Sequence, residues 1–463
     1  MPARFVNIDH DTPLLLPPDL RAWVPPDHLV HFIMDAAGEL DLGGARVNER
    51  GSGSEQYPPR TLLALLIYSY ATGVFSSRQI ERSTHDCVPV RLLCADTHPD
   101  HDTICAFRRA HRGLLARSFA QVIELSARCG VLKVGGITVA LDGTKVMASA
   151  SRHSAVSHGR AGELMRELDI EIEELLQKAD AADSAPLDDG LTIPEEVQRR
   201  QERKAQLAKA RAEIEARAHA RAQIERAEYE RKLAARDAAR AAGKKPRGKE
   251  PQPPDGQPAA KEQYNFTDPE SRIMPVSGGG FEQSYNAQAA VEVESRLIVG
   301  QHVSDAANDK QQLEPGLRAI EPAAGPVGEV LIDSGFVSEA AVRAVETRSD
   351  GAASGVRVLA AMGREPHGRR VRDLEKKSDP PEPAPGAPWA EHMLWRVRTA
   401  AGRARYKLRQ QTVEPVFGII KAALGFRSFR LRGKAGAALE WTLVTLAYNL
   451  RRLHRLGASV KAA

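Results

Sequence analysis

The sequence has no long apolar run. Among its 463 residues no stretch of about 18 apolar residues occurs, and the N-terminus does not combine a basic start with an apolar segment. We therefore expect a soluble, intracellular protein of the cytoplasm that does not enter a membrane. Aromatic residues are scarce at 5%, and a single one, Tyr229, lies between Ala161 and Gln263. That central segment is too poor in aromatic residues to form a large core of its own.

The sequence also has no CxxC pair. Its four cysteines are Cys87, Cys94, Cys105 and Cys129. A zinc site made of Cys87, Cys94, His98 and His101 is conceivable, but those spacings match no standard zinc finger. Reduced cysteines packed among helices are the favoured state.

The sequence carries almost equal numbers of basic and acidic residues. Lys and Arg exceed Asp and Glu by only five, giving a pI near 9.0, which is compatible with nucleic acid but weak evidence for it. Hydrophobic residues make up 42%, enough for two or three domains with a sizeable core.

Residues 1–130 are predicted to be helical. Helices are expected from about Asp27, after the Pro58–Pro59 pair, and from Asp102 or Thr103 through Leu125. On this last helix Arg108, Arg109, Arg112 and Arg117 lie off the apolar face. Two interpretations stay open: a helical bundle with solvated arginines, or a helix-turn-helix-like DNA-binding domain.

Residues 161–262 differ in composition from the rest. Ala, Glu, Arg, Lys and Gln dominate, and the apolar positions do not repeat over successive heptads. We predict an antiparallel helical hairpin, broken at DSAPLDDGLTIP and leaving through the flexible KKPRGKEPQPPDGQP. Such a hairpin could meet DNA or another subunit, or be a solvated helical insertion.

The remaining sequence predicts a mixed sheet flanked by helices. ITVALDGTKV (137–146) and EVLIDSGF read as strands ending at Asp142 and Asp333, and AQAAVEVE with RLIVGQHVS reads as a hairpin. A helix is expected to begin at Asp309, a further strand at 356–361, and helices at 403–424 and 437–455. Residues 363–392 are predicted to be a loop or a poorly ordered insertion. Strand, hairpin, strand, helix is the order of an RNase H-like domain.

Three acids stand where such a domain can bring them together. Asp142 and Asp333 end neighbouring strands, and Glu414 lies on a later helix. Clustered carboxylates repel unless divalent cations lie between them, and two Mg²⁺ ions in such a site can activate a water or a 3′-hydroxyl for phosphodiester chemistry. Spacings of four, three and seven place Lys407, Gln411, Glu414 and Lys421 on one helix face. Taken singly, Asp142–Gly143 is also compatible with an ordinary turn, and Glu414 with a surface acid.

The sequence resembles the DDE transposases of bacterial insertion sequences. Their Y-x2-R-x3-E-x6-K signature is matched by Tyr406, Arg409, Glu414 and Lys421, except that four residues instead of three separate Arg409 from Glu414. That extra residue rotates Arg409 by about 100° on the helix. The segments around LDGTKV, LIDSGF, PVFGIIKAALGFRSFRLRG and LAYNLRRL also look like this family. PPRTLLALLIYSYATGVFSSRQIE and HPDHDTICAFRR resemble its N-terminal helical domain.

The resemblance implies an N-terminal helical DNA-binding domain (1–130) and an RNase H-like catalytic domain (131–463) interrupted by the insertion. It implies Asp142, Asp333 and Glu414 as catalytic ligands of two Mg²⁺ ions, with Mn²⁺ as a substitute. Asp305 or Asp309 could replace Asp333. The implied DNA contacts are Tyr406, Arg409, Lys421 and Lys145.

The implied activity is binding of the element's terminal inverted repeats, DNA cleavage and strand transfer by a homo-oligomer on DNA. The alternatives are a catalytically inactive, transposase-derived DNA-binding protein, a helical scaffold, and a metal-dependent nuclease without strand transfer. Joined DNA product distinguishes a transposase from all three.

Overall fold

The computed structural model describes residues 19–47, 55–133, 135–182, 193–241, 243, 249–276, 278–348, 350–363 and 378–460. Most of the predicted break within the insertion, most of the basic part of its exit, and about half of the predicted loop at 363–392 lie outside the described residues. Within the described residues no helix is both long and apolar enough to cross a membrane.

The N-terminal part of the chain is helical, as its apolar spacing predicts. A short 3₁₀ turn (Leu20–Trp23) precedes α1 (Leu29–Glu39), α2 (Pro59–Ala71), α3 (Ser77–Asp86), α4 (Val88–Leu93), α5 (His101–Ala110) and α6 (Arg112–Arg128). Pro59 opens α2, where its missing N–H leaves no helix hydrogen bond unmade. The single helix expected from Asp102 through Leu125 was wrong. The chain breaks at His111, whose φ of −111° and ψ of 38° leave the helical region, and α6 restarts at the next residue.

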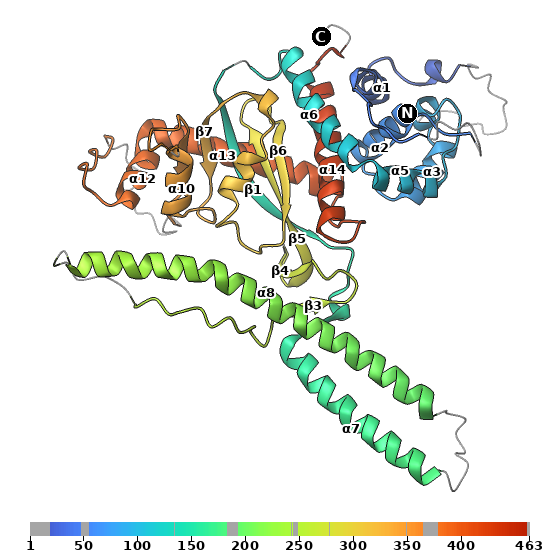
Figure 1. Cartoon of the computed structure of the whole chain (residues 1–463). Coiled ribbons are helices and arrows are strands. Elements are labelled where there is room, and N and C mark those ends of the chain that lie inside the picture. The colour runs from blue at the N-terminus through green and yellow to red at the C-terminus, as the bar shows by residue number, and fades with distance from the viewer. Residues whose placement is uncertain are drawn as a thin grey trace, which may run out of the picture.

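A mixed sheet forms the centre of the molecule (Figure 1). Its strands are β1 (Ile137–Met147), β4 (Arg272–Pro275), β5 (Phe281–Glu292), β6 (Ile298–Ser304), β7 (Val327–Ile332) and β8 (Arg357–Ala360). The order is β4-β5-β1-β7-β8, with β6 also paired to β5. β1 is antiparallel to β5 and parallel to β7, which is parallel to β8. The predicted hairpin is β5 and β6, paired antiparallel.

Two local expectations in the sheet were wrong. Asp142 does not end its strand: β1 continues to Met147, and Asp142 pairs with Ala289 of β5. Pairing with β7 stops at Ala140, so Asp142 lies where β1 extends past its parallel neighbour. Asp309 does not begin a helix, because α9 (Leu313–Arg318) starts four residues later, after Gln312.

Helices cover both faces of the sheet. Asp142, Ala289 and Gln301 are in register across β1, β5 and β6, so they point to one face. α13 (Ala400–Gly418) and α14 (Lys434–Arg455) pack there, and the side chain of Gln301 donates to Thr442 of α14 at 2.8 Å. α9 packs on the opposite face, next to Leu141. α10 (Glu339–Glu346) and α12 (Trp389–Arg398) lie near β8.

One hydrophobic core joins the N-terminal helices to the sheet. α14 contacts α2, α6 and β6, and its buried residues share a single cluster with those of α1, α2 and β1. Arg108 of α5 lies inside this core, where it donates to the Tyr70 hydroxyl at 2.8 Å. Neither predicted role for Arg108, a solvated arginine or a DNA contact, fits that buried position.

The insertion is the predicted antiparallel hairpin. α7 (His158–Ala182) packs on the first half of α8 (Ile193–Ala241), and the pair projects from the rest of the molecule (Figure 1). A two-stranded sheet of β2 (Ala155–Ser157) and β3 (Gln263–Asn265) joins the hairpin to the domain. Its small core contains Leu207 and Ile214 of α8 packed with Tyr264. Ion pairs such as Arg200–Glu171 (2.7 Å) link the two helices.

Candidate active site

Asp142 lies on β1 and faces α13. Its Oδ1 accepts the N–H of Gly143 at 2.8 Å, and its Oδ2 accepts from Nη2 of Arg409 on α13, also at 2.8 Å. Its side chain is 19% exposed. One carboxylate oxygen is therefore held by the backbone, and the other is held by a cation.

Asp333 follows β7 immediately, at the edge where β1 extends past β7. Its Oδ1 accepts the N–H of Gly335 at 2.8 Å, and its Oδ2 lies 3.9 Å from Nη2 of the same Arg409. The hydrogen bond to Gly335 is a local turn that aspartate commonly forms after a strand. Because β1 and β7 are parallel neighbours, the two acids predicted from sequence meet at one guanidinium.

Burial and like charge both act on Asp142. They raise its pKa to about 6; burial is the largest cause, and the negative charge of Asp333 adds to it. Arg409 acts in the opposite direction and lowers the pKa of Asp142. Keeping Asp142 ionised in this site therefore costs free energy, and Arg409 offsets only part of that cost.

Glu414, the third predicted acid, lies on the same helix as Arg409 but is exposed to solvent. Lys407 and Gln411 are exposed with it, as their common helix face predicts. No group of three His, Cys, Asp and Glu side chains within the described residues lies close enough together to hold a metal ion. In this structure Asp142 and Asp333 form a pair, and Glu414 stands outside it.

The predicted DNA-binding residues surround the pair, each with a partner inside the chain. The Tyr406 hydroxyl donates to the Ile332 carbonyl at 3.1 Å, and Lys421 Nζ donates to the Lys145 carbonyl at 2.6 Å. Burial, with help from nearby Arg427, lowers the pKa of Lys421 to about 8. Lys421 belongs to a π-helical turn (Ile419–Ala423) after α13, where the regular spacing that aligned it with Glu414 no longer applies.

Lys145 and Asp309 lie on the other face of β1, behind Asp142. Asp309 accepts from Asn286 at 2.7 Å and from Gln288 at 2.6 Å, and Lys145 Nζ is 3.8 Å away. A side chain on Gly143 would overlap this cluster: its Cβ would lie 2.2 Å from Gln288 Nε2. Glycine after Asp142 thus leaves room for the polar side chains behind the site.

Asp305, the other alternative second acid, follows β6. Its carboxylate pairs with Arg272 at 3.1 Å and with Lys434 at 2.9 Å. These two cations hold the pKa of Asp305 below its usual value although burial opposes them.

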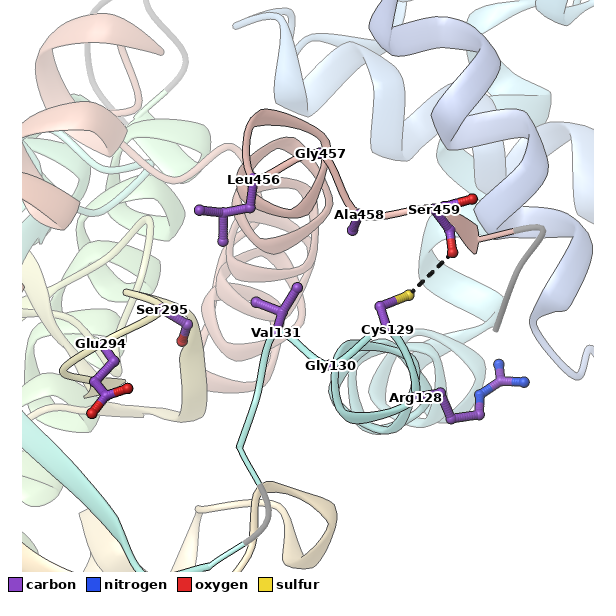
Figure 2. Close-up of a pocket in the computed structure, with 10 residues that line it drawn as sticks. All are labelled: Arg128, Cys129, Gly130, Val131, Glu294, Ser295, Leu456, Gly457, Ala458 and Ser459. Atoms are coloured by element: carbon purple, nitrogen blue, oxygen red, sulfur yellow. Dashed lines mark hydrogen bonds between the residues drawn. The ribbon is translucent and has the colours of Figure 1, made fainter.

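The cysteines and a surface pocket lie away from these acids. All four cysteines are free. The Nδ1 atoms of His98 and His101 contact Thr84 and Glu81, respectively. The pocket lies between the C-terminal ends of α6 and α14 (Figure 2), where the Cys129 thiol donates to the Ser459 carbonyl at 3.6 Å. It contains none of the predicted site residues.

Sequence reasoning missed the role of Arg409 as the shared partner of both acids. Part of the signal was present: Arg409 shares a helix face with Val413 and Val416, which indicates a buried side chain but not the acid that it meets. It also missed Glu440, which is fully buried on α14 and accepts a hydrogen bond from the Tyr70 hydroxyl at 2.9 Å. Glu440 interrupts an otherwise apolar helix face, and that interruption was visible in the sequence.

Comparison with known proteins identifies two parts of the chain. The family model described as "Transposase DDE domain" matches residues 388–454, which contain α12, α13, the π turn and nearly all of α14. The model described as "Transposase domain (DUF772)" matches residues 18–110, the helices up to α5. No curated protein and no solved structure matches the chain. The two matches flank Asp142 and Asp333 in the order that the motifs predict, and they support an insertion-sequence DDE transposase.

Proposed function

We propose that this protein binds the terminal inverted repeats of its insertion sequence and catalyses metal-dependent DNA cleavage and strand transfer. The observation that carries the proposal is the convergence of Asp142 and Asp333, from adjacent parallel strands, on one cation at the edge of the sheet. The two family-model matches suggest the reaction class, and the convergence of these acids supports placing the chemistry at the end of β7, beside β1.

The strand arrangement supports an RNase H-like catalytic domain within residues 131–463. The order β6-β5-β1-β7-β8, with β5 antiparallel to its neighbours and the last strands parallel, puts the first acid on the central strand. The second acid follows the neighbouring parallel strand. The hairpin α7–α8 leaves this domain after β1, and we treat it as an insertion rather than as part of the catalytic sheet.

The donor set fits a divalent cation. Both Oδ2 atoms already stabilise positive charge, and their Oδ1 partners are backbone N–H groups, which fix the direction of each carboxylate. Carboxylate oxygens are the ligands that Mg²⁺ and Mn²⁺ take. When bound, the metal would activate the attacking oxygen and stabilise the leaving oxygen of a phosphodiester. Asp142 and Asp333 would hold it, and Glu414 is the third acid that the sequence signature assigns to the site.

The basic residues around the acids supply DNA contacts in this proposal. Lys421 contacts the Lys145 carbonyl near the end of β1, the Lys145 side chain lies on the face of β1 opposite Asp142, and Arg409 and Tyr406 lie on α13. The cations among them would neutralise the phosphate backbone at the cleaved strand. We place repeat recognition in the helices of residues 1–130. Joining two element ends requires more than one copy of the chain on DNA.

The test is a cleavage and strand-transfer assay in Mg²⁺ on DNA carrying the element's own ends. Wild type is compared with Asp142→Asn, Asp333→Asn and Glu414→Gln, and Asp305→Asn serves as a matched control acid beside the same sheet. We expect both products to be lost in the first three variants and kept in the control, with DNA binding retained by all.

Each contrary result has its own meaning. An active Glu414→Gln variant would remove Glu414 from the site. Cleavage without joined product would reduce the function to that of a nuclease. Specific end binding by an inactive wild type would instead favour a DNA-binding protein without catalysis.

A further inference from the structure

Arg409 occupies the place between the two acids. Its Nη2 lies 2.8 Å from Asp142 Oδ2 and 3.9 Å from Asp333 Oδ2, and its side chain is only 10% exposed. Its Nε is buried and has no hydrogen-bond partner within the described residues. The guanidinium thus contacts the two carboxylates through one nitrogen, Nη2, and its Nε makes no hydrogen bond within the described residues.

The position of Arg409 is set by the packing of α13. One turn earlier, Arg405 makes a similar bridge between the same two strands: it donates to Glu329 of β7 at 2.7 Å and to Thr138 Oγ1 of β1 at 2.6 Å. Residues four apart lie on the same helix face, so both arginines follow the line between β1 and β7. Glu414 points to solvent from the same helix. The helix therefore presents a cation, and not its acid, to Asp142 and Asp333.

A guanidinium and a divalent cation cannot share these oxygens. Arg409 Nη2 occupies the space that a cation bridging the two Oδ2 atoms would take, and two positive groups within a few ångströms repel strongly in a partly buried site. Metal entry therefore requires Arg409 to leave. A released guanidinium at this edge is suited to a phosphate, which it binds through two parallel hydrogen bonds.

We propose that Arg409 is a built-in competing cation, which holds the acid pair together in the metal-free chain and must be displaced when metal binds. This inference rests on the proposed function, because it takes Asp142 and Asp333 as metal ligands. In this inference Arg409 is not a permanent DNA contact. It pairs with the two acids in the metal-free chain and with a DNA phosphate once metal is bound. Metal affinity is then low until DNA offers Arg409 another partner.

The test measures Mn²⁺ binding to the full chain without DNA, by the electron paramagnetic resonance signal of free Mn²⁺. Arg409→Gln removes the competing charge, and Arg405→Gln is the matched control on the same helix face. We expect Arg409→Gln to bind Mn²⁺ about tenfold to a hundredfold more tightly than wild type, the range that one charge-assisted hydrogen bond corresponds to. Arg405→Gln should bind as wild type does.

A second measurement, thermal melting, shows whether the variants are still folded and whether Mn²⁺ stabilises them. Without Arg409 the two carboxylates repel, so Arg409→Gln and the apolar Arg409→Met should both melt at lower temperature than wild type. MnCl₂ should raise their melting temperatures by more than it raises that of wild type. Equal Mn²⁺ responses in wild type and in both variants would overturn the inference.

Asp142→Asn and Asp333→Asn separate this inference from the proposed function. If they abolish Mn²⁺ binding while Arg409→Gln leaves the affinity unchanged or weaker, the acids are metal ligands and Arg409 is no competitor. If they bind Mn²⁺ as wild type does, the metal site is elsewhere and both proposals fail.

Discussion

Arg108 and Arg409 are both buried arginines that pair with acids, and their surroundings differ. Arg108 and Glu440 are 4% and 0% exposed and lie between the N-terminal helices and α14. Glu440 accepts from Tyr70 and from the N–H groups of Arg430 and Leu431, at 2.6 to 3.1 Å. Around Arg409, Asp142 and Asp333 are 19% and 38% exposed, and each has a single backbone donor.

The difference separates a structural ion pair from a reactive one. Glu440 is surrounded by donors from three parts of the chain and has no space for a ligand. The acids at Arg409 open towards solvent at a sheet edge, and only one cation stands between them. A buried carboxylate is tolerated where donors surround it, as they surround Glu440; where donors are few and the carboxylate is accessible, a ligand can supply the rest.

The largest expected effect on stability comes from breaking the closed pair. Glu440→Ala leaves Arg108 buried without its acid and removes the acceptor of Tyr70 and of the segment at Arg430. Loss of one partner of a buried ion pair costs about 3–5 kcal/mol. We expect a loss of this size in the free energy of unfolding, measured by urea denaturation followed by circular dichroism.

The double variant Arg108→Leu with Glu440→Leu is the control for that prediction. Removing both charges leaves no unpaired ion, so it should lose clearly less stability than the sum of the two single changes. Additive losses would mean that the two residues do not act as a pair.

A smaller effect is expected from filling the space behind the open pair. In Gly143→Ala the new Cβ would lie 2.6 Å from Asn286 Oδ1 and from Asp309 Oδ1, as well as close to Gln288. Overpacking of this kind costs roughly 1–3 kcal/mol. Gly418→Ala is the control, because a Cβ there meets nothing within 4 Å. It should be neutral or slightly stabilising in urea denaturation, and equal losses in both variants would contradict the overlap.

The open pair should respond to loss of an acid in the opposite direction to the closed one. Asp142→Asn keeps the shape of the side chain but removes a charge that burial and Asp333 disfavour. We expect the metal-free protein to gain roughly 1 kcal/mol in unfolding free energy while strand transfer falls by at least about 10³-fold. A variant that loses stability as Glu440→Ala does would place Asp142 among the structural acids.

The sequence predicted the elements of this fold better than it predicted which side chains meet. Buried strands such as β1 and β7 could be predicted because they are short runs made mostly of apolar residues. The hairpin β5–β6 could be predicted because a short turn joins two such runs. The partners of Arg409 could not be read from the spacing, since they depend on how α13 lies across two strands. Glu414 shows the same limit: its helix was predicted, and the direction of its side chain was not.

The smallest expected effect comes from an exposed pair of the same residue types. Arg318 and Glu314 lie one turn apart on α9 and contact at 2.5 Å, with side chains 78% and 62% exposed. Water screens such a pair, and neither partner loses hydration when the other is removed, so Arg318→Ala should change the unfolding free energy by less than about 0.5 kcal/mol. The same urea denaturation measures it, and 1 M NaCl should leave the difference from wild type unchanged within error. A loss near that of Glu440→Ala would show that arginine–carboxylate contacts in this chain stabilise it whether buried or not, and burial would no longer distinguish the three sites.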